Sequence, residues 1–176
     1  VDLSRAAQSQ VLVATQGGGV RSCGPNGTLW KKDVGMSVSW ARPVYDREGR
    51  MAEWLVCSEG GTVWSLDPET GETRSQWGAG AGDTIPALGD VDGDGVTDLV
   101  VTLPYGGVSC RSGVGEWESW EVATAANVVA RPSIQDVDGD KVADVVAAGK
   151  DGCVHVVTGL DGQLHWRFQA EASVRL

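Results

Sequence analysis

The stretch Asp90-Val91-Asp92-Gly93-Asp94-Gly95-Val96-Thr97-Asp98, followed directly by Leu99-Val100-Val101, decides how this chain folds. It places aspartates at positions 1, 3, 5 and 9 of a loop that runs into a hydrophobic strand. Alternate carboxylates on a turning backbone can point inward at one hard cation, and without a cation they repel one another. Position 7 can offer only its backbone carbonyl. The loop therefore predicts a cation site formed by Asp90, Asp92, Asp94, Val96 and Asp98.

The loop opens like an EF-hand, with the pattern D-x-D-x-D-G, but it departs from an EF-hand in two ways. The bidentate glutamate expected at position 12 is replaced by Val101. The flanking residues Leu99 to Val101 are typical of a strand, whereas an EF-hand loop lies between helices. We therefore expect a calcium loop that leads into a β-strand.

The same loop recurs along the chain. A full copy at 136–144 predicts a second site formed by Asp136, Asp138, Asp140, Val142 and Asp144. A degraded copy begins at Asp46 and a fainter one at Asp2, so first positions fall at 2, 46, 90 and 136, with spacings of 44, 44 and 46. A period in the forties is typical of a propeller blade or another repeat array.

The four copies differ in their expected affinity for a cation. All side-chain ligands in the two full loops are oxygens, and no Cys or His lies nearby in the sequence, which favours Ca²⁺ over zinc or copper. Lys141 replaces Gly95 at position 6, where an unusual backbone angle is expected, so the second site should bind more weakly. Arg50 replaces the third aspartate of the copy at Asp46, and its guanidinium could bridge Asp46 and Glu48 in place of a metal. We expect two Ca²⁺ per chain, at 90–98 and 136–144.

Short apolar runs separated by Gly-rich turns fill the rest of the chain, without helical periodicity. Each unit supplies four short strands, with the Asp loop between the first and the second. The sequence thus predicts an all-β domain over residues 1–176 with repeats at about 1–35, 36–79, 80–125 and 126–171, and with 172–176 as a closing strand.

These patterns resemble known propeller repeats. The loop D-x-D-G-D-x-x-x-D before a hydrophobic strand resembles the FG-GAP repeat of integrin alpha-chain propellers. The segments 61–71 and 152–166 resemble the quinoprotein (PQQ-like) propeller blade. In that family tryptophans dock one blade on the next, a role the resemblance implies for Trp30, Trp77, Trp120 and Trp166. The resemblance covers nearly the whole chain and implies a β-propeller of four-stranded blades, but a propeller fold does not define a function.

Residues 172–176 resemble the first strands at 41–44 and 130–133, while no such strand precedes the loop at Asp2. The C-terminal segment should therefore complete the first blade, because an unpaired sheet edge is costly. Two closures are open: a four-bladed ring from one chain, or an eight-bladed ring from two chains that exchange C-terminal strands.

Composition limits the classes of function. The net charge of −10 and the lack of a basic patch argue against nucleic acid. No apolar run approaches the roughly 18 residues of a membrane span, and no signal peptide is recognisable, as expected for a mature or trimmed form.

The cysteines Cys23, Cys57, Cys110 and Cys153 lie in apolar strand contexts, which favours buried free thiols, although one or two disulfides of unknown pairing stay possible. Asn26-Gly27-Thr28 is a glycosylation sequon.

The histidines and tryptophans give no catalytic signature. If Thr158 pairs with Gln163, His155 faces Trp166 and His165 faces Val156, on opposite faces of the sheet, so a shared metal is not expected. The chain lacks the adjacent Cys–Cys pair of quinoprotein enzymes, which argues against a quinone cofactor. Four tryptophans are not assigned to blade docking, and they favour blade core over a sugar-stacking platform; they are Trp40, Trp54, Trp64 and Trp117.

The expected function is a calcium-binding, non-enzymatic β-propeller for extracellular recognition or adhesion, with a protein or glycan ligand. Two alternatives stay open: a propeller lectin, and the propeller part of a polysaccharide-active enzyme. No nucleophile or general base lies beside the Asp loops in the sequence, which argues against the enzyme.

Overall fold

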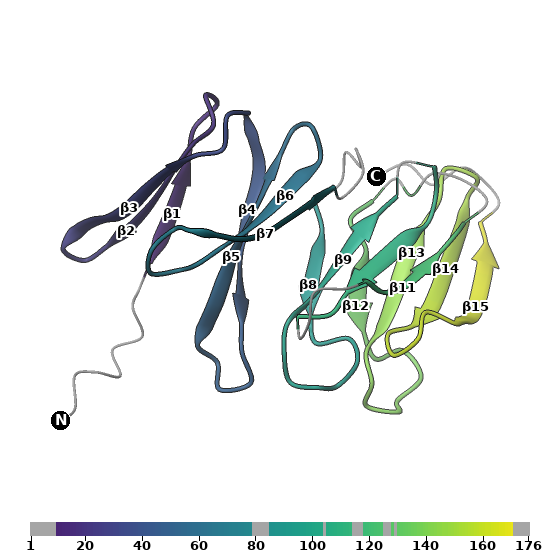
Figure 1. Cartoon of the computed structure of the whole chain (residues 1–176). Helices are drawn as coiled ribbons and strands as arrows, with labels where there is room; N and C mark the ends of the chain where they lie inside the picture. Colours follow the sequence, from purple (N-terminus) through teal and green to yellow (C-terminus); the bar gives the residue numbers. More distant parts are fainter. Residues whose placement is uncertain are drawn as a thin grey trace. The chain divides into compact units, whose positions relative to one another are not determined.

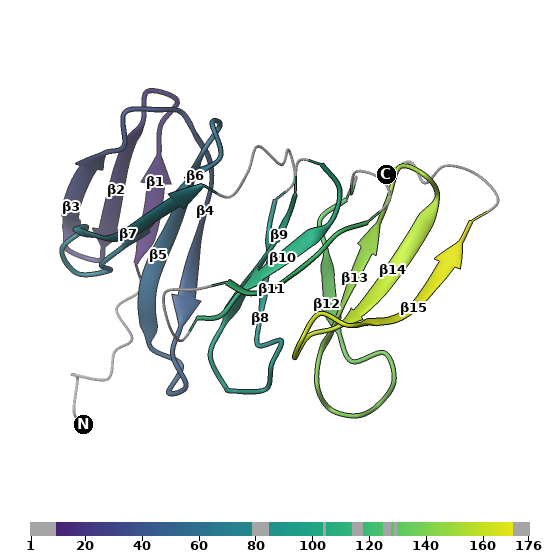
Figure 2. The same ribbon diagram turned by 45° about the vertical axis from the view of Figure 1, so that its right-hand side comes forward.

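The computed structural model describes residues 10–78, 85–103, 105–113, 118–124, 128 and 130–170. Every regular element in these residues is a β-strand, and every strand pairing is antiparallel (Figures 1 and 2). None of the described segments forms a helix that could cross a membrane. The chain divides into two compact units between Gly78 and Ala79. The predicted all-β class is confirmed.

The first unit contains two sheets whose strands follow one another in chain order. One sheet has the order β1-β2-β3 and the other β4-β5-β6-β7. Their bounds are β1 Val11–Ala14, β2 Gly19–Gly24, β3 Gly27–Asp33, β4 Val38–Tyr45, β5 Met51–Ser58, β6 Thr62–Leu66 and β7 Thr73–Gly78. The closing strand predicted at 172–176 and the faint loop at Asp2 lie outside the described residues.

The second unit contains two four-stranded sheets, again with strands in chain order. Their bounds are β8 Ala87–Gly89, β9 Asp98–Thr102, β10 Val108–Arg111, β11 Glu118–Val122, β12 Ser133–Gln135, β13 Asp144–Ala148, β14 Cys153–Thr158 and β15 Leu164–Gln169. In this unit the full Asp loops connect β8 to β9 and β12 to β13, between the first and second strands of each sheet, as predicted.

A β-bulge interrupts the last strand of every sheet, one residue before a fixed position that carries a tryptophan in three sheets. Trp30 pairs with Ser22, Trp120 with Cys110 and Trp166 with Val156 after this bulge. In β7 the same position is Ser75, and Trp77 lies two residues further on, opposite Val63. Trp77 therefore does not share the register of the other three tryptophans, although the bulge lies at the same place in its sheet.

Two of these tryptophans join neighbouring sheets within a unit. The indole Nε1 of Trp30 donates to the carbonyl oxygen of Pro68 at 2.9 Å, and a Cβ on Gly71 would lie 2.5 Å from its ring. Trp120 repeats the arrangement in the second unit, with Gly162 below its ring. Trp166 has the same register but keeps 46% of its surface exposed.

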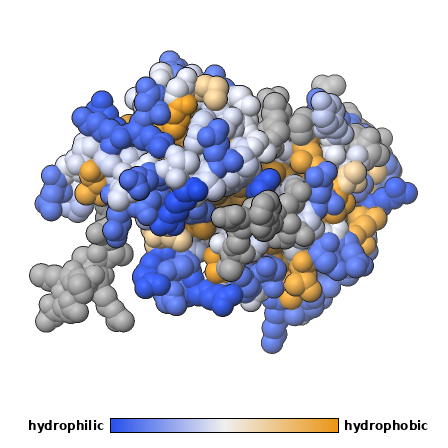
Figure 3. All heavy atoms as spheres, viewed as in Figure 1, coloured by the Kyte–Doolittle hydropathy of each residue, from blue (hydrophilic) through white to orange (hydrophobic). Residues whose placement is uncertain are grey.

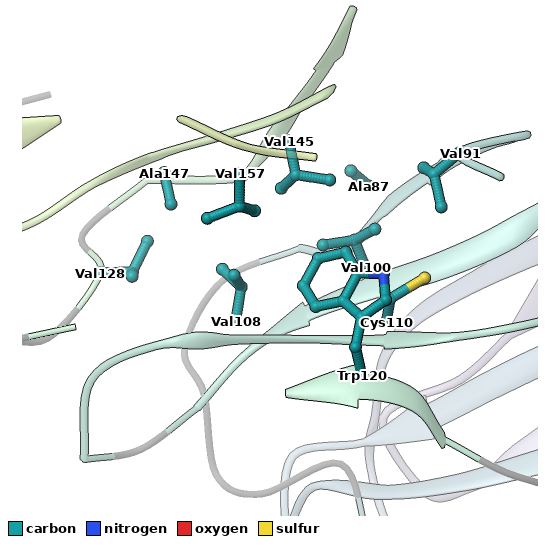
Figure 4. Packing of buried hydrophobic residues seen from close by; sticks show 10 residues of the cluster. All are labelled: Ala87, Val91, Val100, Val108, Cys110, Trp120, Val128, Val145, Ala147 and Val157. Carbon is teal, nitrogen blue, oxygen red and sulfur yellow. The ribbon is translucent and has the colours of Figure 1, made fainter. Parts of the chain in front are cut away.

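The core of each unit lies between its two sheets. In the second unit, side chains from β9, β10 and β11 face those from β13 and β14, with Trp120 across the ends of Val100 and Cys110 (Figure 4). In the first unit Trp54 and Trp64 belong to the core, 6% and 7% exposed, as expected for blade core. Trp117 lies outside the described residues.

The four cysteines are free thiols, and three of them are buried. Burial raises the pKa of Cys57 to about 11, which keeps this thiol protonated and unreactive. The face shown in Figure 3 is largely hydrophilic, with separate hydrophobic spots. The sequon residue Asn26 is exposed in the turn between β2 and β3, where a glycan would have access.

Candidate metal centres

In the loop between β8 and β9, backbone N–H groups hold the aspartates at positions 1, 3 and 5. Asp90 accepts from Gly93 at 2.8 Å through Oδ1 and from Gly95 at 2.9 Å through Oδ2. Asp92 accepts from the N–H of Asp94 at 3.0 Å, and Asp94 accepts from that of Val96 at 2.7 Å. Each of these residues is fixed by its neighbour two to five positions on, so the sequence spacing itself builds the turn.

The loop between β12 and β13 has the same frame. Asp136 accepts from Gly139 at 2.7 Å and from Lys141 at 3.0 Å, at the same two positions. Asp138 accepts from Asp140 at 3.0 Å, and Asp140 from Val142 at 2.7 Å. Two loops 46 residues apart thus share every one of these contacts.

Both loops gather carboxylate oxygens. In the first, one oxygen each of Asp90, Asp92 and Asp94 lie within 4.8 Å of one another. In the second the same holds for Asp136, Asp138 and Asp144. An oxygen that accepts one N–H keeps a further lone pair, so these bonds are compatible with a bound cation. Each group contains three of the four predicted aspartates. The first group lacks Asp98, at position 9, and the second lacks Asp140, at position 5.

The position-9 aspartates also lock the loop to the sheet. Asp98 is 1% exposed, and it accepts from the N–H of Val91 at 2.8 Å and from that of Gly113 at 2.9 Å. Asp144 accepts from the N–H of Val137 at 3.0 Å. Burial raises the pKa of Asp98, and the charges of Asp92 and Asp94 add to the shift, while its two backbone hydrogen bonds oppose it.

A histidine and a cysteine that are distant from the loops in the sequence lie close to them in the structure. The Nε2 atom of His165 is 3.6 Å from Oδ2 of Asp138. Cys110 is close enough to Asp98 and Asp92 that their charges, after burial itself, help to raise the pKa of its thiol to about 12. Both residues come from strands that follow the loop in the same sheet, so sequence distance concealed their proximity.

The degraded copy holds a guanidinium where the full loops gather carboxylates. Arg50 donates through Nε to Oδ2 of Asp46 and through Nη2 to Oε2 of Glu48, both at 2.8 Å. The bridge expected from the sequence is confirmed. The pKa of Asp46 is lowered, first by the backbone N–H of Arg50 and then by its side chain.

Position 6 of the loops requires the left-handed backbone conformation. Gly95 has φ of 83°, and Lys141 at the same position has φ of 74°. Lys141 is the one described residue other than glycine with a positive φ. The unusual angle expected at this position is confirmed, and it costs a residue with a side chain about 1–2 kcal/mol.

Two glycines that the sequence analysis did not single out seat the loops. Gly113 and Gly159, each just past the third strand of its sheet, lie against the carbonyls of Thr97 and Ala143, where a Cβ would clash. Gly159 also lies against the carbonyl of Val91, from the preceding loop. Gly113 and Gly159 follow the last aspartate of their loops at the same distance in the sequence, and this shared spacing is the signal that could have identified them.

The expected position of His155 is also wrong. Thr158 pairs with Gln163 as predicted, with an N–H···O distance of 2.9 Å. A bulge in β15, between this pair and the pair that contains His155, then shifts the register. As a result His155 lies opposite Arg167, and Trp166 lies opposite Val156.

No family model matches the chain, and no curated protein matches it. Solved structures do match. They include BamB from Moraxella catarrhalis (19% identity, TM-score 0.61, 90% of this chain and 44% of that one) and the C-terminal WD40 domain of Sif2 (11%, 0.65, 93% and 44%). A third is BBS1N in complex with ARL6DN (17%, 0.62, 96% and 53%). The chain spans about half the length of these proteins.

These likenesses are too low in identity to assign an activity, but they agree in architecture with the sheets described above. The expected FG-GAP relationship is not tested by them. Consecutive antiparallel sheets, one with three described strands and three with four, are the blades of a β-propeller, and that is the fold of this chain.

Proposed function

We propose that this chain is a calcium-binding β-propeller module that works outside the cell in recognition or adhesion, without catalysis. The observation that carries the proposal is the shared frame of the loops at 90–98 and 136–144. Three carboxylates converge in each loop, all ligands are hard oxygens, and the backbone already holds the turn. A cation there offsets the mutual repulsion of the aspartates.

Calcium in these loops has a structural role in the proposal. Val91, inside the first loop, is 1% exposed and belongs to the core of the second unit. Gly159 lies against the carbonyl of Val91, and its own carbonyl oxygen accepts a hydrogen bond from Nε1 of Trp120. Ordering the loop thus stabilises the contact between two blades, and the ion need not touch a ligand.

Metal analysis and calorimetry test the proposal. We expect two Ca²⁺ per chain, and one after either Asp92→Asn or Asp138→Asn, since the amide oxygen can keep the backbone bond while the charge is lost. The matched control is Asp46→Asn, in the loop held by Arg50, which should leave both ions. Each site should stabilise the fold by about 2.7 kcal/mol when Ca²⁺ is at about 100 times the Kd of that site. An unchanged melting temperature with and without chelator would overturn the calcium proposal.

Recognition is tested separately, by a glycan array and by binding of cell-surface proteins. One sugar bound strongly would favour the lectin alternative, and turnover of a polysaccharide would favour the enzyme. Trp54 and Trp64 are buried and offer no surface for sugar stacking, whereas Trp166 keeps 46% of its surface exposed and is the tryptophan to substitute if a sugar binds.

Light scattering distinguishes the two possible closures, a ring from one chain and a homodimer that exchanges residues 172–176. A mass of 18.4 kDa corresponds to one chain, and twice that mass to an eight-bladed assembly.

A further inference from the structure

A second kind of donor cluster lies at the start of β14, away from the Asp loops. Asp151, Cys153 and His155 each place one ligand atom within 4.8 Å of the others. Cys153 and His155 are two residues apart on a strand and so share a face. Ala147, which pairs with His155, and Val157 point into the core in Figure 4, so this is the face turned to the core.

The cluster is held together by hydrogen bonds that leave one member without a partner. The Sγ of Cys153 donates to Oε1 of Gln169 at 2.9 Å, and its N–H donates to Oδ1 of Asp151 at 3.0 Å. Gln169 donates through Nε2 to the carbonyl of Asp151 at 3.0 Å. Gln169 lies directly opposite Cys153 on β15, the strand beside β14 in Figures 1 and 2.

His155 is the member without a partner. Its Nε2 exposes less than 1 Å² and has no hydrogen-bond partner among the described residues. A buried polar atom without a partner is destabilising, and such atoms are rare in folded proteins. A ligand that accepts the lone pair of an imidazole nitrogen would remove that cost.

The backbone around the cluster makes room for the carboxylate. A Cβ on Gly149 would lie 2.6 Å from Oδ1 of Asp151, so a side chain there would displace the carboxylate from its position in the cluster. The N–H of Gly149 donates to the carbonyl of Cys153 at 2.8 Å and closes the tight turn around the cluster.

We propose that Asp151, Cys153 and His155 bind a borderline-soft divalent metal ion such as Zn²⁺, with Gln169 Oε1 or a water as the fourth ligand. Thiolate, imidazole and carboxylate are the donors that zinc takes, whereas calcium takes oxygens alone. Tetrahedral zinc at bond lengths of about 2.0–2.3 Å needs ligand atoms about 3.3–3.8 Å apart, so side-chain rotations that bring the three atoms slightly closer complete the site.

Charge and proton balance are consistent with this site. Binding releases the thiol proton to solvent, which ends the donation from Cys153 to Gln169 and leaves Oε1 of Gln169 available to the metal. The divalent ion, one thiolate and one carboxylate sum to zero charge. Arg167, opposite His155, therefore faces a neutral centre.

The test is a titration with Zn²⁺ in saturating Ca²⁺, which keeps the Asp loops filled. We expect one Zn²⁺ per chain, and binding at least tenfold weaker in Cys153→Ser and His155→Gln. Two matched controls should bind as the native chain does. Cys110→Ser changes another buried thiol, and His165→Gln removes the histidine beside Asp138. Unchanged binding in Cys153→Ser, or loss in a control, would overturn the site.

A second measurement uses the native chain, in case a variant does not fold. Co²⁺ in place of Zn²⁺ should give the intense near-ultraviolet band of a cobalt–thiolate bond, and Zn²⁺ should protect one thiol from alkylation. Without the cobalt–thiolate band, the proposal fails. Asp92→Asn should leave zinc binding intact, so failure of the calcium proposal and failure of this one are distinguishable.

Discussion

Trp120 donates a hydrogen bond from its indole Nε1 to the carbonyl oxygen of Gly159 at 2.7 Å, across the two blades of the second unit. Gly159 lies at the same time against the carbonyls of Val91 and Ala143, one from each Asp loop. Gly159 therefore accepts the hydrogen bond of the docking tryptophan and also contacts both candidate metal loops. Mutations here should affect blade packing and metal affinity together.

Trp120→Phe should destabilise the fold by about 1–3 kcal/mol, because the carbonyl of Gly159 loses its partner while most of the ring remains. Ser75→Ala, at the same register position of β7, should change stability by less than about 0.5 kcal/mol. Urea unfolding followed by tryptophan fluorescence and far-ultraviolet circular dichroism measures both. Equal effects of the two substitutions would contradict the docking role.

Gly162→Ala should cost more than Gly49→Ala. Both glycines have a left-handed backbone, with φ of 69° and 72°, so both substitutions carry the same conformational cost of about 1–2 kcal/mol. A Cβ on Gly162 would also lie 2.7 Å from Cδ2 of Trp120, whereas one on Gly49 meets nothing within 4 Å. We expect an extra cost of about 1–3 kcal/mol from the clash, measured by thermal unfolding. Similar melting temperatures for the two variants would contradict this prediction, because they would show that the indole ring of Trp120 moves aside without cost.

Lys141→Gly should stabilise the protein by about 0.5–1 kcal/mol, because relief of the left-handed strain exceeds the added entropy of the unfolded chain. Gly95→Ala, the reverse change at the same position of the other loop, should destabilise it. Calorimetry at fixed Ca²⁺ checks the signs. In the calcium proposal, Lys141→Gly also tightens the weaker of the two sites, and a lower affinity would contradict that link.

Acid should remove the contribution of Asp67 to stability. Nη2 of Arg74 donates to Oδ2 of Asp67 at 2.7 Å, and this bond, with the N–H of Thr70, lowers the pKa of Asp67 from 3.8 to about 2. A lowered folded-state pKa stabilises the fold above pH 3.8 and ceases to do so as the pH falls towards 2. Asp67→Asn should therefore be less stable than the native chain at pH 6, with a smaller difference at pH 2.5. A difference independent of pH would contradict this origin.

The sequence was sufficient to predict the blades because each unit repeats the same local signals. The Asp loop, the Gly-rich turns and the following apolar strands all act within about ten residues of one another, and each predicted Asp-loop turn in the described residues formed. Arg50 could be placed as a bridge for the same reason, since both its partners are within four residues.

Contacts that depend on strand register could not be predicted in this way. A one-residue bulge in β15 moved His155 from Trp166 to Arg167, and in β7 Ser75, rather than Trp77, occupies the position directly after the bulge. His165 reached Asp138, and Gln169 reached Cys153, across strand pairs. The cluster on β14 was not recognised because its three donors look like an ordinary alternating strand until His155 is seen to lack a partner.

Arg50 gives the loop at 46–53 a cation that cannot diffuse away. Its effective concentration at Asp46 and Glu48 is set by a tether of four residues, and it does not depend on the surrounding medium. Within one chain, then, one copy of the loop has a permanent counter-ion, while two copies are proposed to take theirs from solution. Falling calcium should therefore loosen the blades unequally, and limited proteolysis would begin in the loops at 90–98 and 136–144 while the loop at Arg50 stays intact.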